Sequence, residues 1–175
     1  MTTSVSTPSS RSTRVDHDVF ISYSRKDKEF VHILHQALTQ SKYDAWVDWI
    51  DIPFTADWWK EIETGIEATD TFIFVISPDS IRSEVCGREI DHAVTNHKRL
   101  IPIVQREGFE TLSMHPALRK FNWLFFRESD DFDSAFQSLV EAINTDLEYV
   151  QAHTRLLVRA VEWEKKQRSQ DLLLR

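Results

Sequence analysis

The sequence predicts an α/β domain in which a five-stranded parallel sheet is covered by helices on both faces. Short β-branched and aromatic runs alternate along the chain with segments whose apolar residues recur every three or four positions, a pattern typical of strand-helix-strand units. One run, residues 71–76, is apolar without alternation, as expected of a central strand covered on both faces. The 175 residues are enough for one such domain with tails.

The expected elements follow one another in regular order. Strands are expected at residues 17–23, 43–47, 71–76, 100–104 and 122–126. Helices are expected to begin at Ser24, at the cap Asp57 and at residues 77–80, with a closing helix over residues 131–144. Because crossovers between parallel strands are right-handed, we expect a flavodoxin-like strand order, with any ligand beyond the carboxyl ends of the strands.

The two ends of the chain differ in composition from its middle. Residues 1–15 are rich in Ser and Thr and are expected to be a disordered leader, whereas residues 16–146 are expected to form the domain. Residues 147–175 mix charged and apolar positions and end in three leucines and Arg175. We expect a charged helix that links to a further domain; the alternative is a helix folded back on this one.

Composition argues against several classes of function. The 21 Lys and Arg against 28 Asp and Glu give a net charge of −7, so a nucleic-acid partner is not expected. Cys86 is the only cysteine, which excludes an internal disulfide and favours a reducing, cytoplasmic compartment. No segment approaches the roughly 20 apolar residues that cross a bilayer, so a membrane partner is not expected.

Known phosphate and metal motifs are absent from the sequence. Glycines occur only at positions 65, 87 and 108, which excludes the glycine-rich phosphate loops of dinucleotide-binding and P-loop proteins. His32 and His35 share a predicted helix face without a third ligand, so no metal is expected. A receiver domain needs acidic residues after its first strand and an Asp after its third, where this chain has Ser22 and Ser77.

Glu89 is the candidate catalytic residue, on the helix predicted over residues 80–94. The apolar residues of this helix form a stripe that we expect to be buried: Val85, Cys86, Ile90, Ala93 and Val94. Glu89 lies four residues after Val85 and four before Ala93, so its carboxylate falls at the edge of the stripe, where burial raises a carboxyl pKa. Spacing alone favours the alternative, a half-exposed glutamate paired with a nearby arginine.

Four segments, in order, resemble those of the Toll/interleukin receptor (TIR) domain family, in particular its bacterial and plant members. Residues 18–24, Asp-Val-Phe-Ile-Ser-Tyr-Ser, resemble the opening strand. Residues 46–58 resemble the second strand, the loop after it and the next helix entry. The Ser-Pro pair at 77–78 with Ser80, Ser83, Cys86 and Glu89 is similar to the third strand end and the Trp-Cys-x-x-Glu helix, and residues 121–123 resemble the last strand.

This resemblance implies the activity of the NAD-cleaving branch of the family. The glutamate of the helix motif corresponds by spacing to Glu89, and the implied reaction breaks the nicotinamide N-glycosidic bond to give nicotinamide and ADP-ribose or a cyclic ADP-ribose. NAD is then the substrate, and no cofactor or metal is implied. One carboxylate is enough to stabilise an oxocarbenium-like ribose, because the nicotinamide is already cationic and needs no acid to protonate it.

The expected substrate-binding residues surround the same strand ends: Ser22, Tyr23, Ser24, Arg25, Trp49, Phe54 and Cys86. Arg25 is expected to pair with the diphosphate, as the resemblance implies, although a solvated charge at a helix start is an equal alternative. Trp49 and Phe54 offer rings for stacking on nicotinamide or adenine, whereas Trp58 is expected to pack in the core.

The resemblance also implies self-association with other TIR domains, through the loop over residues 48–56, in bacterial defence signalling. The competing hypothesis is an adaptor that recruits other TIR domains without catalysis. The sequence departs from the family pattern at two places: Val85 stands where the helix motif has Trp, and Phe54 and Thr55 stand where a Gly usually follows the loop proline.

Overall fold

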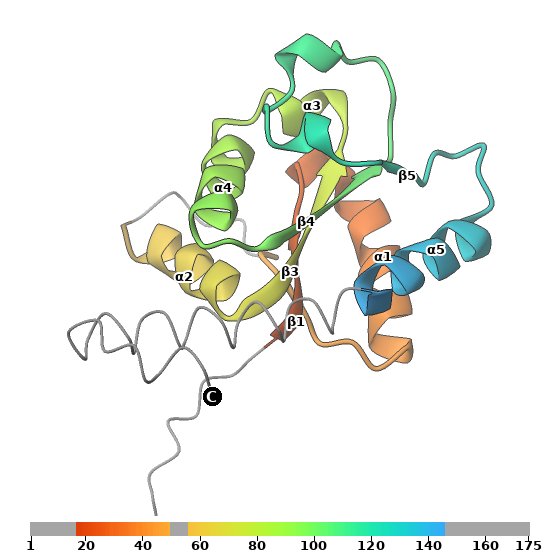
Figure 1. Ribbon diagram of the computed structural model, residues 1–175, viewed down its shortest axis with the longest axis horizontal. Helices are drawn as coiled ribbons and strands as arrows, with labels where there is room; N and C mark the ends of the chain where they lie inside the picture. The colour runs from red at the N-terminus through yellow and green to blue at the C-terminus, as the bar shows by residue number, and fades with distance from the viewer. Residues whose placement is uncertain (1–16, 50–55, 146–175) are drawn as a thin grey trace, which may run out of the picture.

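The sheet has five parallel strands in the order β2-β1-β3-β4-β5 (Figure 1). The computed structural model describes residues 17–49 and 56–145. The strands are β1 (His17–Ser22), β2 (Ala45–Val47), β3 (Thr69–Ile76), β4 (Arg99–Val104) and β5 (Leu124–Phe125). This order confirms the predicted flavodoxin-like topology, in which ligands bind at the carboxyl edge beside the point where the strand order reverses.

Two helices cover each face of the sheet (Figure 1). Helices α1 (Lys28–Gln40) and α5 (Phe132–Thr145) lie on one side, and α2 (Ala56–Glu67) and α4 (Glu84–Thr95) lie on the other. Four shorter helices occupy the connections: η1 (Arg25–Asp27), α3 (Pro78–Ile81), η2 (Thr111–Ser113) and η3 (Leu118–Lys120).

The central strand β3 contributes to the core on both faces of the sheet. Phe72 and Phe74 pack with the buried residues of α2 and α4, whereas Ile73 and Val75 pack with those of α1 and α5. All four are essentially inaccessible to solvent. The unbroken apolar run therefore has the cause that the sequence indicated, a strand that is buried on both sides.

The segment after β3 differs from the single helix that was expected over residues 80–94. Ser77 and Ser80 form a reciprocal capping box that starts α3, and this helix ends at Ile81. Ser83 then caps α4, its hydroxyl oxygen accepting a hydrogen bond from the Cys86 backbone N–H at 3.3 Å. A second cap inside the segment thus restarts the helix. Val94, expected in the buried stripe, is 44% exposed.

Other boundaries moved by a few residues. The turn that begins after Ser24 is the 3₁₀ helix η1, with α1 starting only at Lys28, and β5 is shorter than the expected strand. Helix α2 starts at Ala56, so Asp57 lies within its first turn and is not its cap.

Some sequence predictions lie outside the described residues: the leader, the C-terminal helix, and residues 50–55 of the loop, including Phe54. Within the described segments, no helix is both long and apolar enough to cross a bilayer.

Candidate functional site

Glu89 meets Ser22 at the carboxyl edge of the sheet. Ser22 is the last residue of β1, and its hydroxyl donates a hydrogen bond of 2.5 Å to the Glu89 carboxylate, which α4 presents from the side. Glu89 is only 6% exposed, and both residues count among the buried polar groups. The alternative of a half-exposed glutamate paired with an arginine is therefore wrong, because the packing of α4 on the sheet buries this face of the helix.

Burial dominates the acidity of this carboxyl. Desolvation raises the pKa of Glu89 to about 8, the hydrogen bond from Ser22 works in the opposite direction, the negative charge of Asp48 raises it further and the positive charge of Arg25 lowers it. Near neutral pH, Glu89 is therefore mostly protonated, and a nearby cation favours its ionised form. A carboxyl tuned in this way is typical of a functional site.

Cys86 lies one turn before Glu89 on α4 and is buried as well. Its thiol donates to the Tyr23 backbone oxygen across 3.4 Å, so it ties the helix to the residue that follows β1. Desolvation first, and then the charge of Glu89, raise the pKa of Cys86 to about 12. The thiol is thus neutral, and Cys86 contributes to this site as a small buried side chain that packs near the Glu89 carboxylate.

Asp48 is the residue of this site that sequence reasoning missed. It follows β2 directly, its Oδ2 accepts a hydrogen bond of 2.9 Å from Trp58 Nε1 and lies 3.6 Å from Arg25 Nη2, and its backbone oxygen accepts from the Tyr23 hydroxyl at 2.9 Å. Its position immediately after a strand end was the available signal. The sequence gives no indication of the partners, which lie at separations of 10 to 25 residues.

The aromatic residues near this edge have distinct surroundings. Trp58 is 7% exposed and packs in the core, as expected. Trp49 stacks on His32 with ring centroids 4.2 Å apart and meets His35 edge-on at 5.4 Å. A pocket of about 270 Å³ lies between β2 and α2, lined by Trp46, Val47, Asp48, Trp49, Trp58, Glu61 and Ile62. The pocket places indole rings beside the carboxylates of Asp48 and Glu61. Asp48, which also interacts electrostatically with Glu89, connects this pocket to the Glu89 site.

A second buried acid, Asp27, lies at the same edge. Its side chain has no exposed area, and it accepts hydrogen bonds from Ser77 Oγ at 2.5 Å and from Arg106 Nε at 2.9 Å. Arg106 also bonds to Asp79 at 2.8 Å, and Asp79 bonds to Lys26 at 2.7 Å. This charged network joins the exits of β1, β3 and β4, and it is absent from the sequence predictions.

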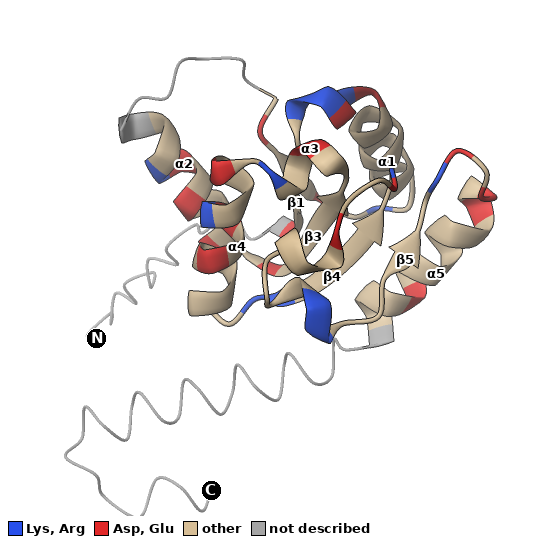
Figure 2. Ribbon diagram, turned by 90° about the horizontal axis from the view of Figure 1, so that it is seen from above, with Lys and Arg blue, Asp and Glu red and all other residues tan. Residues whose placement is uncertain are grey.

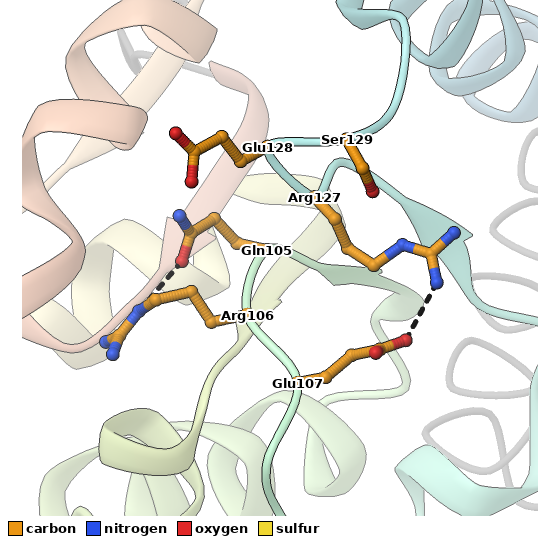
Figure 3. A pocket seen from close by; sticks show the side chains of 6 residues that line it. All are labelled: Gln105, Arg106, Glu107, Arg127, Glu128 and Ser129. Atoms are coloured by element: carbon orange, nitrogen blue, oxygen red, sulfur yellow. Dashed lines mark hydrogen bonds and ion pairs between the residues drawn. The ribbon is translucent and has the colours of Figure 1, made fainter.

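A wider hollow of about 600 Å³ lies beside this network, lined by the segments that follow β4 and β5. Figure 3 shows that Arg106 and Arg127 point in different directions, with Arg127 bonded to Glu107 and Arg106 to Gln105. Arg127 also bonds to Asp130 at 2.8 Å. Both guanidinium groups are neutralised by carboxylates, so this hollow is a poor anion site. In the described part of the chain, no group of three His, Cys, Asp or Glu residues is arranged to hold a metal.

Comparison with protein families settles what kind of domain carries this site. A family model described as "TIR domain" matches residues 19–140. The chain belongs to the TIR domain family. No curated protein matches the chain.

Solved structures that resemble this TIR domain come from several kinds of protein. The TIR domain of the Toll-related receptor TRR-2 from Hydra magnipapillata has a TM-score of 0.61 at 22% identity, covering 73% of this chain and 98% of the other. The TIR domains of the activated Roq1 resistosome give 0.57 at 17% identity, covering 73% and 99%. A metazoan TIR-STING receptor from C. gigas gives 0.55 at 22% identity, covering 75% of this chain and 41% of the other. At these identities the likeness shows the fold.

In this TIR domain, the predicted site residues are partly brought together. Ser22 and Cys86 flank Glu89, and Tyr23 and Arg25 lie against Asp48. Ser24 instead caps η1, its hydroxyl oxygen accepting from the Lys26 backbone N–H at 3.4 Å. In Figure 2, Lys and Arg positions are interspersed with Asp and Glu positions over α2 and α4, whereas α5 carries acidic positions alone.

Proposed function

We propose that this TIR domain cleaves the nicotinamide N-glycosidic bond of NAD, with Glu89 as the catalytic carboxylate. The observation that carries the proposal is a buried carboxyl at the sheet edge where α/β folds bind ligands, bonded to the neutral Ser22 hydroxyl and shifted to a pKa of about 8. Before a ligand binds, desolvation disfavours the ionised form of this carboxyl. A positive charge that develops beside it stabilises that ionised form, and the carboxylate stabilises the positive charge in return.

The chemistry requires one carboxylate at the ribose. As the C–N bond breaks, its electron pair passes to the nicotinamide nitrogen, which leaves as neutral nicotinamide, and positive charge develops on the ribose ring. Glu89 in its ionised form stabilises that charge. Water then attacks the ribose carbon and loses a proton, giving ADP-ribose; attack by a ring nitrogen of the adenine gives a cyclic product instead.

The surroundings of Glu89 suit the rest of a dinucleotide. Arg25 is 40% exposed and within electrostatic reach of Glu89, so its guanidinium is available to a diphosphate at the mouth of the site. The tryptophan-lined pocket between β2 and α2 suits a flat heteroaromatic ring, with Trp49 as the predicted stacking partner.

Activation by TIR self-association is part of the proposal. Among the solved structures of similar fold are an activated resistosome and the RPS4 and RRS1 TIR domain heterodimer, the latter with a TM-score of 0.55 at 15% identity. Assemblies of TIR domains are thus compatible with this fold. The isolated chain in dilute solution is expected to be monomeric and weakly active.

The test is nicotinamide release from NAD by the full 175-residue chain, both dilute and clustered through a fused oligomerisation tag. Replacing Glu89 by Gln keeps the shape and the hydrogen bond to Ser22 but removes the negative charge. We expect turnover to fall by at least about a hundredfold. Glu84→Gln, an exposed acid in the first turn of the same helix, is the matched control and leaves turnover within about twofold.

Mass spectrometry of the product then distinguishes ADP-ribose from its cyclic forms. Turnover that survives in Glu89→Gln removes Glu89 from the reaction. NAD that stays intact with the clustered wild-type chain contradicts the enzyme and leaves the non-catalytic adaptor as the function of this TIR domain.

A further inference from the structure

Asp48 joins three elements at the mouth of the Glu89 site. Its carboxylate accepts from Trp58 Nε1 on α2 at 2.9 Å and lies 3.6 Å from Arg25 Nη2 on η1, and its backbone oxygen accepts from the Tyr23 hydroxyl after β1. The side chain is 16% exposed, so it borders solvent and is not part of the packed core. It is therefore placed to act on whatever enters the site.

The contact between Asp48 and Arg25 is suited to exchange. The two charged groups are 3.6 Å apart, longer than a tight charge-assisted hydrogen bond, and the Arg25 side chain is 40% exposed. A diphosphate offers a guanidinium two parallel hydrogen bonds and more negative charge than one carboxylate. A diphosphate at the site mouth thus competes well for Arg25.

From these contacts we infer that Asp48 is a positioning residue that holds Arg25 near Glu89 until a ligand binds and then releases it to the ligand's diphosphate group. This inference rests on the proposed function for its ligand, a nucleotide diphosphate. Trp58 keeps the Asp48 carboxylate in place during the exchange, because its indole N–H remains bonded to the same oxygen that faces Arg25.

Asp48 also acts on Glu89 through charge. The groups that face Glu89 are the Ser22 hydroxyl from β1, Arg25 from η1 and Asp48 after β2, with the neutral thiol of Cys86 on its own helix. Asp48 raises the pKa of Glu89 and Arg25 lowers it. We therefore expect removal of the Asp48 charge to lower the titration midpoint of Glu89, an effect that a purely architectural residue would not have.

The decisive variant is Asp48→Asn, which keeps an oxygen for Trp58 and the backbone oxygen for Tyr23 but removes the charge. We expect ADP-ribose, and inorganic pyrophosphate as a minimal probe, to bind about two- to fivefold more tightly by calorimetry, because Arg25 no longer has to leave the Asp48 carboxylate. The gain should vanish in an Arg25→Ala background. Asp48→Ala, which also removes the acceptor of the hydrogen bond from Trp58 Nε1, should bind both probes more weakly than Asp48→Asn.

Asp79→Asn is the matched control, since Asp79 also bonds to a lysine and an arginine at this edge but does not act on Glu89. It should leave ligand affinity within about twofold. The titration midpoint of the Glu89 carboxyl is measured by carbon NMR, and its signal is assigned by its loss in Glu89→Gln. This midpoint should fall in Asp48→Asn and stay unchanged in Asp79→Asn.

Weaker ligand binding in Asp48→Asn, an unmoved Glu89 midpoint, or a gain that persists without Arg25 would each overturn the inference. Failure of the proposed function shows differently, as intact NAD with the clustered wild-type chain. In that case the pyrophosphate measurements still test the exchange of Arg25 between Asp48 and a diphosphate. A wild-type chain that binds neither ADP-ribose nor pyrophosphate overturns the exchange, whatever its turnover of NAD.

Discussion

Glu89 and Asp27 are two buried acids at the same edge of one sheet, and their surroundings are opposite. Asp27 is held by the Arg106 guanidinium and the Ser77 hydroxyl, with no exposed side-chain area. The hydrogen bond to Glu89 comes from the neutral Ser22 hydroxyl. A buried carboxylate in contact with a cation is ionised in the folded protein and acts as a structural group. A buried carboxylate that contacts no cation ionises more readily when a cationic ligand binds beside it, which is typical of a functional group.

The difference teaches where each acid contributes. The charge of Asp27 is compensated inside the protein, so its removal takes one partner each from Arg106 and Ser77 and harms the fold. Desolvation disfavours the ionised form of Glu89, so the carboxylate charge does not stabilise the fold near neutral pH. Burying this carboxyl instead lowers the stability of the folded protein. Substitutions at the two positions are therefore expected to separate stability from activity.

The largest effect on stability is expected for Asp27→Ala. Removing one member of a fully buried ion pair typically costs about 3–5 kcal/mol. Arg106 is 41% exposed and can regain water, so we expect the free energy of unfolding to fall by about 2–3 kcal/mol. Urea denaturation at pH 7 measures this free energy of unfolding. Glu89→Gln, measured alongside, should be as stable as the wild type or more stable.

The control for that comparison is Asp70→Ala, because Asp70 is the exposed residue of β3. It should change stability by no more than about 0.5 kcal/mol. A large loss in Glu89→Gln with none in Asp27→Ala would reverse the assignment of the two acids.

The second expected effect concerns pH, where activity and stability should move in opposite directions. Burial raises the pKa of Glu89 from 4.5 to about 8, so the folded chain binds a proton over this window that the unfolded chain has lost. Stability therefore falls as pH rises from about 4.5 to about 8, with a slope from this one group of up to roughly 1.4 kcal/mol per pH unit. Over the same range, kcat/KM for NAD should rise as Glu89 ionises.

Urea titrations and nicotinamide release measured from pH 5 to 9 test both trends. Glu89→Gln should lose this component of the stability slope. An activity that peaks near pH 5, or a stability slope that is unchanged in Glu89→Gln, would show that the acid titrates with its ordinary pKa.

The fold was largely accessible from sequence, because burial on two faces leaves a local pattern. The apolar run of β3 and the stripes of its neighbouring helices predicted five strands in the observed order. The break between α3 and α4 was missed, since Ser83 is one polar residue whose capping role depends on the Cys86 backbone. Val94 was misplaced because the buried face of α4 runs through Cys86, Glu89, Ile90 and Ala93, and Val94 lies outside it.

The site was accessible only in part, for a different physical reason. Spacing placed Glu89 near the buried stripe, and only the resemblance to TIR domains gave it a role. Its bond to Ser22 joins residues that are 67 positions apart, and the bond from Arg106 to Asp27 spans 79 positions. Such pairings follow from strand order and register, which create no periodicity in the residues involved. Asp27 and Asp48 were missed for this reason.

A smaller effect is expected for Ser22→Ala, which removes the hydrogen bond that lowers the pKa of Glu89. The midpoint of the pH-activity curve should move above about 8, and kcat/KM at pH 7 should fall by roughly three- to tenfold, because less Glu89 is ionised. Activity should recover toward the wild-type value at higher pH. Ser22→Thr, which keeps the hydroxyl, should restore the wild-type curve, whereas an equal loss at every pH would assign Ser22 to substrate binding and not to the acidity of Glu89.

The smallest effect is expected at Cys86, the third buried ionisable group at this edge. Its thiol donates to the Tyr23 backbone oxygen, and burial with the neighbouring charge of Glu89 raises its pKa to about 12. The thiolate, which is the reactive form, is therefore almost absent at pH 8. Ellman's reagent should leave the native chain unmodified over the time in which the urea-unfolded chain reacts completely. Rapid modification of the native chain would mean that α4 opens away from β1, and the same opening would expose Glu89 to water and return its pKa toward the ordinary value.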